Sequence, residues 1–152
     1  MKHSFLLDEN IFYHAIKGTD LLGNEDLSAM DLVVNIARNC HSIRYNTFLL
    51  SRYNVHLERL AREPARVLQP LFFHRHFFAN SLKAVREDAQ PPNLPSSARI
   101  PNEDIDVVRA ALISHPRFIT NDPKLKHAIN ECEQLHLTAL TPTEAMDLAR
   151  DK

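Results

Sequence analysis

Glycine and cysteine are scarce in this sequence, tryptophan is absent, and no apolar run is long. With only two glycines among 152 residues, the chain has no Gly-rich loop to cradle phosphates, which disfavours nucleotide binding of that type. No apolar stretch approaches the roughly 20 residues that span a bilayer, and the first residues do not resemble a secretory signal. We therefore expect a cytoplasmic protein with no membrane partner.

The cysteines and the overall composition bound the class of protein further. Cys40 and Cys132 are isolated and lack metal-type spacing, which suits a reducing compartment. Buried thiols are the favoured interpretation, with a disulfide as the alternative. The apolar fraction of 44% and the charged fraction of 24% are ordinary for a globular protein. The length predicts one domain over residues 1–152.

The net charge of −1 conceals an uneven distribution of charge. Residues 38–86 hold nine Lys or Arg and two Asp or Glu, whereas acidic residues outnumber basic ones elsewhere. A basic middle between acidic ends is typical of contact with a polyanion or an acidic partner. The alternative is a solvated helical face.

Short apolar segments alternate with segments of helical periodicity. This alternation predicts an α/β fold with a mostly parallel sheet covered by helices on both faces. Strands are expected at 4–8, 42–46, 117–120 and 136–140. Helices are expected at 11–17, from a Ser28–Asp31 capping box, at 47–61, from 64 towards 88 with a break near Pro70, at 105–112, after Asp122-Pro123 and after Thr141-Pro142. Residues 89–101 form a Pro-rich internal loop.

Three aspartates occupy corresponding ends of these elements. Asp8 closes the first strand, Asp122 follows the strand at 117–120, and Asp104 lies in the first turn of the helix before it. Because chemistry collects at the carboxyl ends of parallel strands, all three can converge. Such a cluster needs a positive companion, and oxygen ligands suit Mg²⁺ or Mn²⁺. Taken singly, each aspartate is better explained by a structural role, since Asp at a helix start commonly caps free N–H groups.

Four segments together resemble the PIN domains, metal-dependent ribonucleases that include the toxins of toxin–antitoxin pairs. These segments are Phe5–Ile11, Asp104–Ala111, Phe118–Asp122 and Leu140–Met146. The resemblance spans the chain and implies a PIN-like three-layer fold. It also implies a Mg²⁺- or Mn²⁺-dependent endoribonuclease (a hydrolase of phosphodiester bonds) that acts on single-stranded or loop RNA. An antitoxin-like protein partner or a homodimer is a further implication.

The resemblance assigns roles to individual residues. Asp8, Asp104 and Asp122 would be the catalytic metal ligands, with Asp106 as an alternative if the helix phase shifts by two. Asn10 and Thr120 would support them.

One position departs from the family. Arg52 stands where the family usually carries a Glu, and Glu58 lies too far along the helix to replace it. An Arg in the pocket competes for the carboxylates and weakens the metal site. The alternative function is therefore a non-catalytic PIN-fold module that binds RNA or protein.

Two further patterns bear on binding. Arg52, His56 and Arg59 share one helix face and, with Arg44, could track RNA phosphates. The alternative for each is a solvated surface residue. Residues 72–78 hold four Phe and two His, which we interpret as packing or as an apolar face for a partner or second copy.

Overall fold

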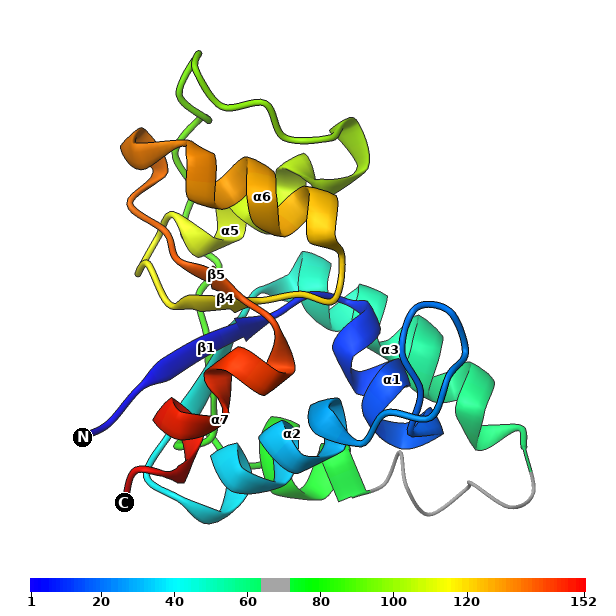
Figure 1. Cartoon of the computed structure of the whole chain (residues 1–152). Helices are drawn as coiled ribbons and strands as arrows, with labels where there is room; N and C mark the ends of the chain where they lie inside the picture. Colours follow the sequence, from blue (N-terminus) through cyan, green and yellow to red (C-terminus); the bar gives the residue numbers. More distant parts are fainter. Residues whose placement is uncertain (64–71) are drawn as a thin grey trace.

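The computed structural model describes residues 1–63 and 72–152, with five short parallel strands at its centre (Figure 1). The strands lie side by side in the order β3-β2-β1-β4-β5, with bounds β1 Ser4–Leu7, β2 Ser42–Tyr45, β3 Ala84–Arg86, β4 Arg117–Ile119 and β5 Ala139–Leu140. The helices are α1 Asn10–Lys17, α2 Ser28–Arg38, α3 Thr47–Ala61, the π-helical turn His74–Phe78, the 3-10 turn Asn102–Asp104, α5 Ile105–Ala111, α6 Pro123–Glu131, the 3-10 turn Glu133–Leu135 and α7 Pro142–Arg150.

Helices cover the sheet on both faces. Helix α2 packs against α1 and α7 on one face, and α5 and α6 lie on the other (Figure 1). Helix α3 packs against α1 and β2, so the first two crossover segments stay on the same side of the molecule. The predicted fold class, a short parallel sheet flanked by helices on both faces, is confirmed.

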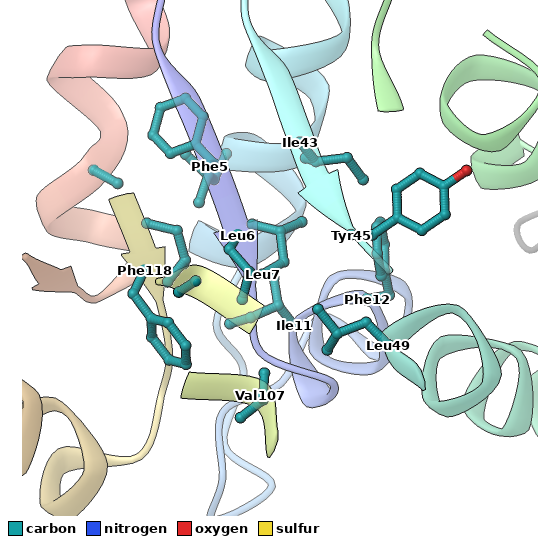
Figure 2. Packing of buried hydrophobic residues seen from close by; sticks show 14 of the residues in the cluster. Phe5, Leu6, Leu7, Ile11, Phe12, Ile43, Tyr45, Leu49, Val107 and Phe118 are labelled. Atoms are coloured by element: carbon teal, nitrogen blue, oxygen red, sulfur yellow. The ribbon is translucent and has the colours of Figure 1, made fainter. Parts of the chain in front are cut away.

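The central strand β1 is apolar after Ser4 because both of its faces are covered. Phe5, Leu6 and Leu7 are all buried, as expected of a strand in the middle of a parallel sheet. Leu6 and Leu7 lie between Ile43 of β2 and Phe118 of β4 (Figure 2). The packing of this core determines where β1 ends and therefore where Asp8, the next residue, lies.

An aromatic cluster forms the core between α1, α3 and the segment from 72 to 78. Phe73 and Phe77 have no exposed surface, and their rings lie 5.0 and 6.1 Å from that of Phe12. The ring of Tyr53 meets the same Phe12 ring edge-on at 4.9 Å. The packing interpretation of this Phe-rich segment is thus confirmed for these two side chains.

The predicted helix from 64 towards 88 is wrong at its carboxyl end. Residues 84–86 form the edge strand β3, in which Val85 pairs with Arg44 of β2. The Lys83 ammonium group binds the backbone carbonyls of Ile36, Asn39 and His41 at the end of α2. These long-range contacts override the local helical periodicity. The expected helix start at Pro64 and the break at Pro70 lie outside the described residues.

The helix starts are partly as predicted. Thr141 and Glu144 form a full capping box at the start of α7. At α2 the predicted box is absent, since Ser28 is the first helical residue and its backbone N–H donates to Asp26 Oδ1 at 2.9 Å. The acid just before the helix thus takes the role that the sequence assigned to Ser28.

The two cysteines are free thiols in different surroundings. Cys132 is buried, as expected, but Cys40 is exposed, so the expectation of two buried thiols is wrong for Cys40. Across the described ranges, no helix has both the length and the apolar character needed to cross a bilayer.

Candidate functional site

The candidate site lies where the direction of strand addition reverses. From β1 the chain continues to β2 and β3 on one side of the sheet and later to β4 and β5 on the other. The segment that follows β1 therefore crosses one face of the sheet, and the segment that follows β4 crosses the other face. The crevice between the carboxyl ends of two such strands is the usual ligand site of open parallel sheets. Asp8 directly follows β1, and Asp122 follows β4.

The structure brings the three predicted aspartates to one place. A hollow of about 180 Å³ is lined by Asp8, Asp104 and Asp122 together with Asn10. A second hollow of about 100 Å³ shares Asp8 and Asp104 and is closed on its other side by Arg52. The larger hollow is lined by acidic side chains without Lys or Arg, whereas the smaller one contains a cation, and Asp8 and Asp104 are among the acids that line both.

Asp8 is buried, with 8% of its surface exposed, and two hydrogen bonds hold its carboxylate. The hydroxyl of Thr120 donates to Asp8 Oδ2 at 2.8 Å, and the backbone N–H of Glu9 donates to Oδ1 at 2.8 Å. Burial raises the pKa of Asp8 above its usual value, and these two hydrogen bonds oppose the rise. The carboxylate is therefore fixed in direction before any ligand arrives.

Thr120 also links Asp8 to Asp122. Its Oγ1 accepts a hydrogen bond of 3.0 Å from the backbone N–H of Asp122 while donating to Asp8. Thr120 has no exposed surface. Thr120, which the family resemblance suggested as a supporting residue, thus contacts both of these aspartates.

Asp122 serves as the cap of α6. Its Oδ1 accepts from the backbone N–H groups of Lys124 at 2.9 Å and Leu125 at 3.3 Å. Pro123 occupies the first turn, as the sequence predicted. The structural explanation of Asp122 is therefore correct, and the same side chain also lines the larger hollow.

Asp104 carries the clearest electrostatic signature of the site. It is the residue before α5, and its side chain makes no capping hydrogen bond there. Burial, and then the charges of Asp8 and Glu103, raises the pKa of Asp104 to about 6. Helix capping therefore does not account for the position of the Asp104 carboxylate. The alternative ligand Asp106 is exposed and lines neither hollow.

Sequence reasoning missed four residues of the hollows. Glu9 and Glu103 line both hollows. Their position next to Asp8 and Asp104 was the available signal. His14 and Asn121 line the larger hollow, with Asn121 Nδ2 2.9 Å from His14 Nδ1. Burial lowers the pKa of His14, and nothing in its sequence context pointed to the site.

Arg52 lines the smaller hollow, as its position in the family pattern suggested it could. Its Nε lies 3.9 Å from Glu9 Oε2, and its guanidinium lies 5.1 Å from the centre of the Phe48 ring. The side chains of Arg52 and Glu9 are 55% and 38% exposed. An ion pair this long and this exposed contributes little to stability, so Arg52 is available for another anion.

The other predicted nucleic-acid contacts are engaged within the chain. Arg44 binds the Ser4 hydroxyl at 3.2 Å and lies 3.9 Å from Glu87. Two members of the α3 stripe face α1, where the Arg59 guanidinium lies 4.8 Å from the ring centre of Tyr13 and the His56 ring lies 5.7 Å from it. Of the four predicted residues, Arg52 alone lines either of the described hollows.

The donor chemistry fits a hard divalent cation, but the side-chain positions are not those of a closed coordination shell. In the described residues, no three His, Cys, Asp or Glu side chains are grouped closely enough to hold a metal ion. Burial is the main cause that raises the pKa of Asp104, and the neighbouring carboxylates add to it; a cation would relieve this excess of negative charge.

Comparison with known proteins gives one structural likeness. No protein-family model matches the chain, and no curated protein does. A solved PilT N-terminus domain protein from the hyperthermophilic archaeon Sulfolobus solfataricus is similar over 98% of this chain and 95% of that one, with 10% identity and a TM-score of 0.49.

Proposed function

We propose that the chain is a PIN-like endoribonuclease that uses Mg²⁺ or Mn²⁺ to cleave single-stranded or loop RNA. The observation that carries the proposal is the meeting of Asp8, Asp104 and Asp122 around one hollow at the strand-order reversal. These residues are distant in sequence and come from three separate elements. Helix capping accounts for Asp122 alone, whereas Asp8 and Asp104 cap no helix with their side chains.

In this proposal, several residues of the larger hollow each have a separate part in holding a divalent ion. The Asp8 carboxylate is oriented by the Thr120 hydroxyl and the Glu9 N–H. The Asp122 carboxylate is oriented by the backbone N–H groups at the start of α6. Asp104 supplies the third carboxylate, and Asn10, the first residue of α1, can bind a polar group of the ligand. A divalent ion held by Asp8, Asp104 and Asp122 would supply a polarised water for attack on phosphorus and positive charge for the leaving oxygen.

Cleavage of a labelled single-stranded RNA with Mn²⁺ tests the proposal. The wild type is expected to cut the strand, and Asp8→Asn is expected to lower the rate at least 100-fold. The matched control is Asp106→Asn, since Asp106 is exposed and lines neither hollow. Unchanged cleavage by Asp8→Asn would rule the site out. Loss of cleavage in Asp106→Asn would move the third ligand to that residue.

A second candidate is a non-catalytic module that binds RNA or protein. Arg52 favours it, because a guanidinium beside carboxylates can supply the positive charge that a metal otherwise provides. A thermal melt with and without Mn²⁺ separates the two candidates. A rise in melting temperature indicates a working metal site through ligand linkage, and no change favours the binding module. Arg52→Glu should then restore the response to Mn²⁺.

A further inference from the structure

The side chains of Phe48 and Arg52 lie together in the smaller hollow, which Asp8 and Asp104 also line. They are four residues apart on α3 and therefore share one face of the helix. Both line the smaller hollow, with the Arg52 guanidinium 5.1 Å from the ring centre of Phe48. Leu49 and Val107 add apolar side chains to the lining, and Asp8 and Asp104 are among its acidic ones. The smaller hollow thus presents an aromatic ring and one cationic side chain beside carboxylates of the candidate site.

We propose that Phe48 and Arg52 are a nucleotide-binding subsite for single-stranded nucleic acid. The base stacks on the Phe48 ring and the guanidinium plane, and an adjoining phosphate pairs with Arg52. This inference rests on the proposed function, because it places the scissile strand against Asp8 and Asp104. Phe48 and Arg52 are positioning residues in this arrangement.

Electrostatics assigns different ligands to the two hollows. The larger hollow has five acidic side chains and no Lys or Arg in its lining, so it favours a cation and repels a phosphate. The smaller hollow has four acidic side chains, but it also contains Arg52, whose positive charge partly offsets their repulsion of a phosphate. A nucleic-acid strand that meets the carboxylates therefore approaches from the Arg52 side. We expect a phosphate to enter the smaller hollow only where it can pair with the Arg52 guanidinium.

Arg52 can exchange its present partner for a phosphate at small cost. The Glu9 oxygen lies 3.9 Å from Arg52 Nε, and both side chains are substantially exposed. A phosphate can accept two parallel N–H hydrogen bonds from the same guanidinium, which is a stronger arrangement. Glu9→Gln, which removes the competing charge, is therefore expected to tighten binding of a single strand.

The chemistry of the hollow selects unpaired bases. A base within a duplex already stacks on both neighbours, whereas an unpaired base can transfer to an aromatic side chain or a guanidinium. Stacking on an aromatic ring tolerates every base because each has a π-face. We therefore expect preference for single strands over duplexes with little sequence dependence.

Binding measured without turnover tests the subsite. Fluorescence anisotropy of a labelled RNA 10-mer, with Mn²⁺ and the full chain carrying Asp8→Asn, gives the reference affinity. Adding Arg52→Met should weaken binding about tenfold and reduce the slope of log K against log salt by about 0.7, the value for one phosphate contact on a single strand. Arg62→Met is the matched control, because Arg62 is exposed at the end of the same helix and lines neither hollow.

An abasic strand isolates the stacking contribution. Phe48→Leu should weaken binding of the normal strand about tenfold, leave the salt slope unchanged and have no effect on an abasic strand. Phe48→Tyr retains the ring and should retain the affinity, which guards against a misfolded Phe48→Leu protein. The proposal is overturned if Arg52→Met and Arg62→Met act alike, or if Phe48→Leu weakens both strands equally. Because no cleavage is measured, these outcomes are independent of the nuclease assay.

Discussion

The Thr120 hydroxyl donates a 2.8 Å hydrogen bond to Oδ2 of Asp8, joining the ends of β4 and β1 across 112 positions of sequence. The same oxygen accepts the backbone N–H of Asp122 at 3.0 Å. One buried side chain thus joins the carboxylate of Asp8 to the backbone of Asp122. The stability of the protein and the geometry of the site are therefore linked at Thr120.

Thr120→Val is expected to destabilise the fold by about 3 kcal/mol, because a buried carboxylate loses a donor and the Asp122 N–H loses an acceptor. Thr120→Ser keeps the hydroxyl and removes one methyl group, so it should cost about 1 kcal/mol. Urea unfolding of the two variants measures the difference. Equal losses would mean that the methyl group, and not the hydrogen bonds, carries the role of Thr120.

Asp104→Asn is expected to stabilise the metal-free protein at pH 7. The raised pKa of Asp104, about 6, means that the folded state disfavours the charged form, first through burial and then through Asp8 and Glu103. Because Asp104 is partly exposed, solvent screening reduces the gain to about 1 kcal/mol. Urea unfolding in EDTA measures it, and Asp106→Asn on the exposed side of α5 is the control. A loss of stability in Asp104→Asn would contradict the crowding of charge at the site.

Substitutions at Asp122 can distinguish its role as a helix cap from its proposed role as a metal ligand. Asn caps helices as well as Asp does, so Asp122→Asn should change stability by less than about 0.5 kcal/mol. Asp122→Ala loses both capping hydrogen bonds and should cost about 1 kcal/mol. We expect both variants to lose Mn²⁺-dependent RNA cleavage. Full cleavage by Asp122→Asn would leave Asp122 as a cap alone.

The protein should lose stability as the pH falls below 6.5. Burial is the main cause that lowers the pKa of His41, His14 and His56 in the folded chain. The unfolded chain then binds more protons below pH 6.5, so stability is present above that pH and is lost as acid charges the folded histidines. Each such group contributes at most about 1.4 kcal/mol per pH unit.

His41→Gln should flatten this pH dependence. His41 has no exposed surface, and its Nδ1 accepts the backbone N–H of His3 at 3.0 Å. Urea midpoints between pH 7.5 and 5.5 give the slope. His127→Gln, at a side chain that is 75% exposed, is the control. The contribution of Asp104, which has the opposite sign between about pH 4 and 6, is the same in both variants and cancels.

Much of the fold could be predicted because its signals are local. The apolar run at Phe5–Leu7, the helical periodicity of α3 and the cap-plus-proline starts of α6 and α7 each stand within a few residues of one another. The edge strand β3 was missed because its three residues carry no strand pattern of their own. Pairing with β2 defines it.

The sequence by itself determined that acidic side chains would follow two strands and that Asp122 would begin a helix, since capping and periodicity act over a few residues. Only the tertiary structure decided that Thr120 bridges Asp8 and Asp122, that Asp104 titrates near pH 6, and that Arg52 faces Glu9 and Phe48. These properties depend on burial and on distances between atoms far apart in the chain, which are set when the helices close over the sheet.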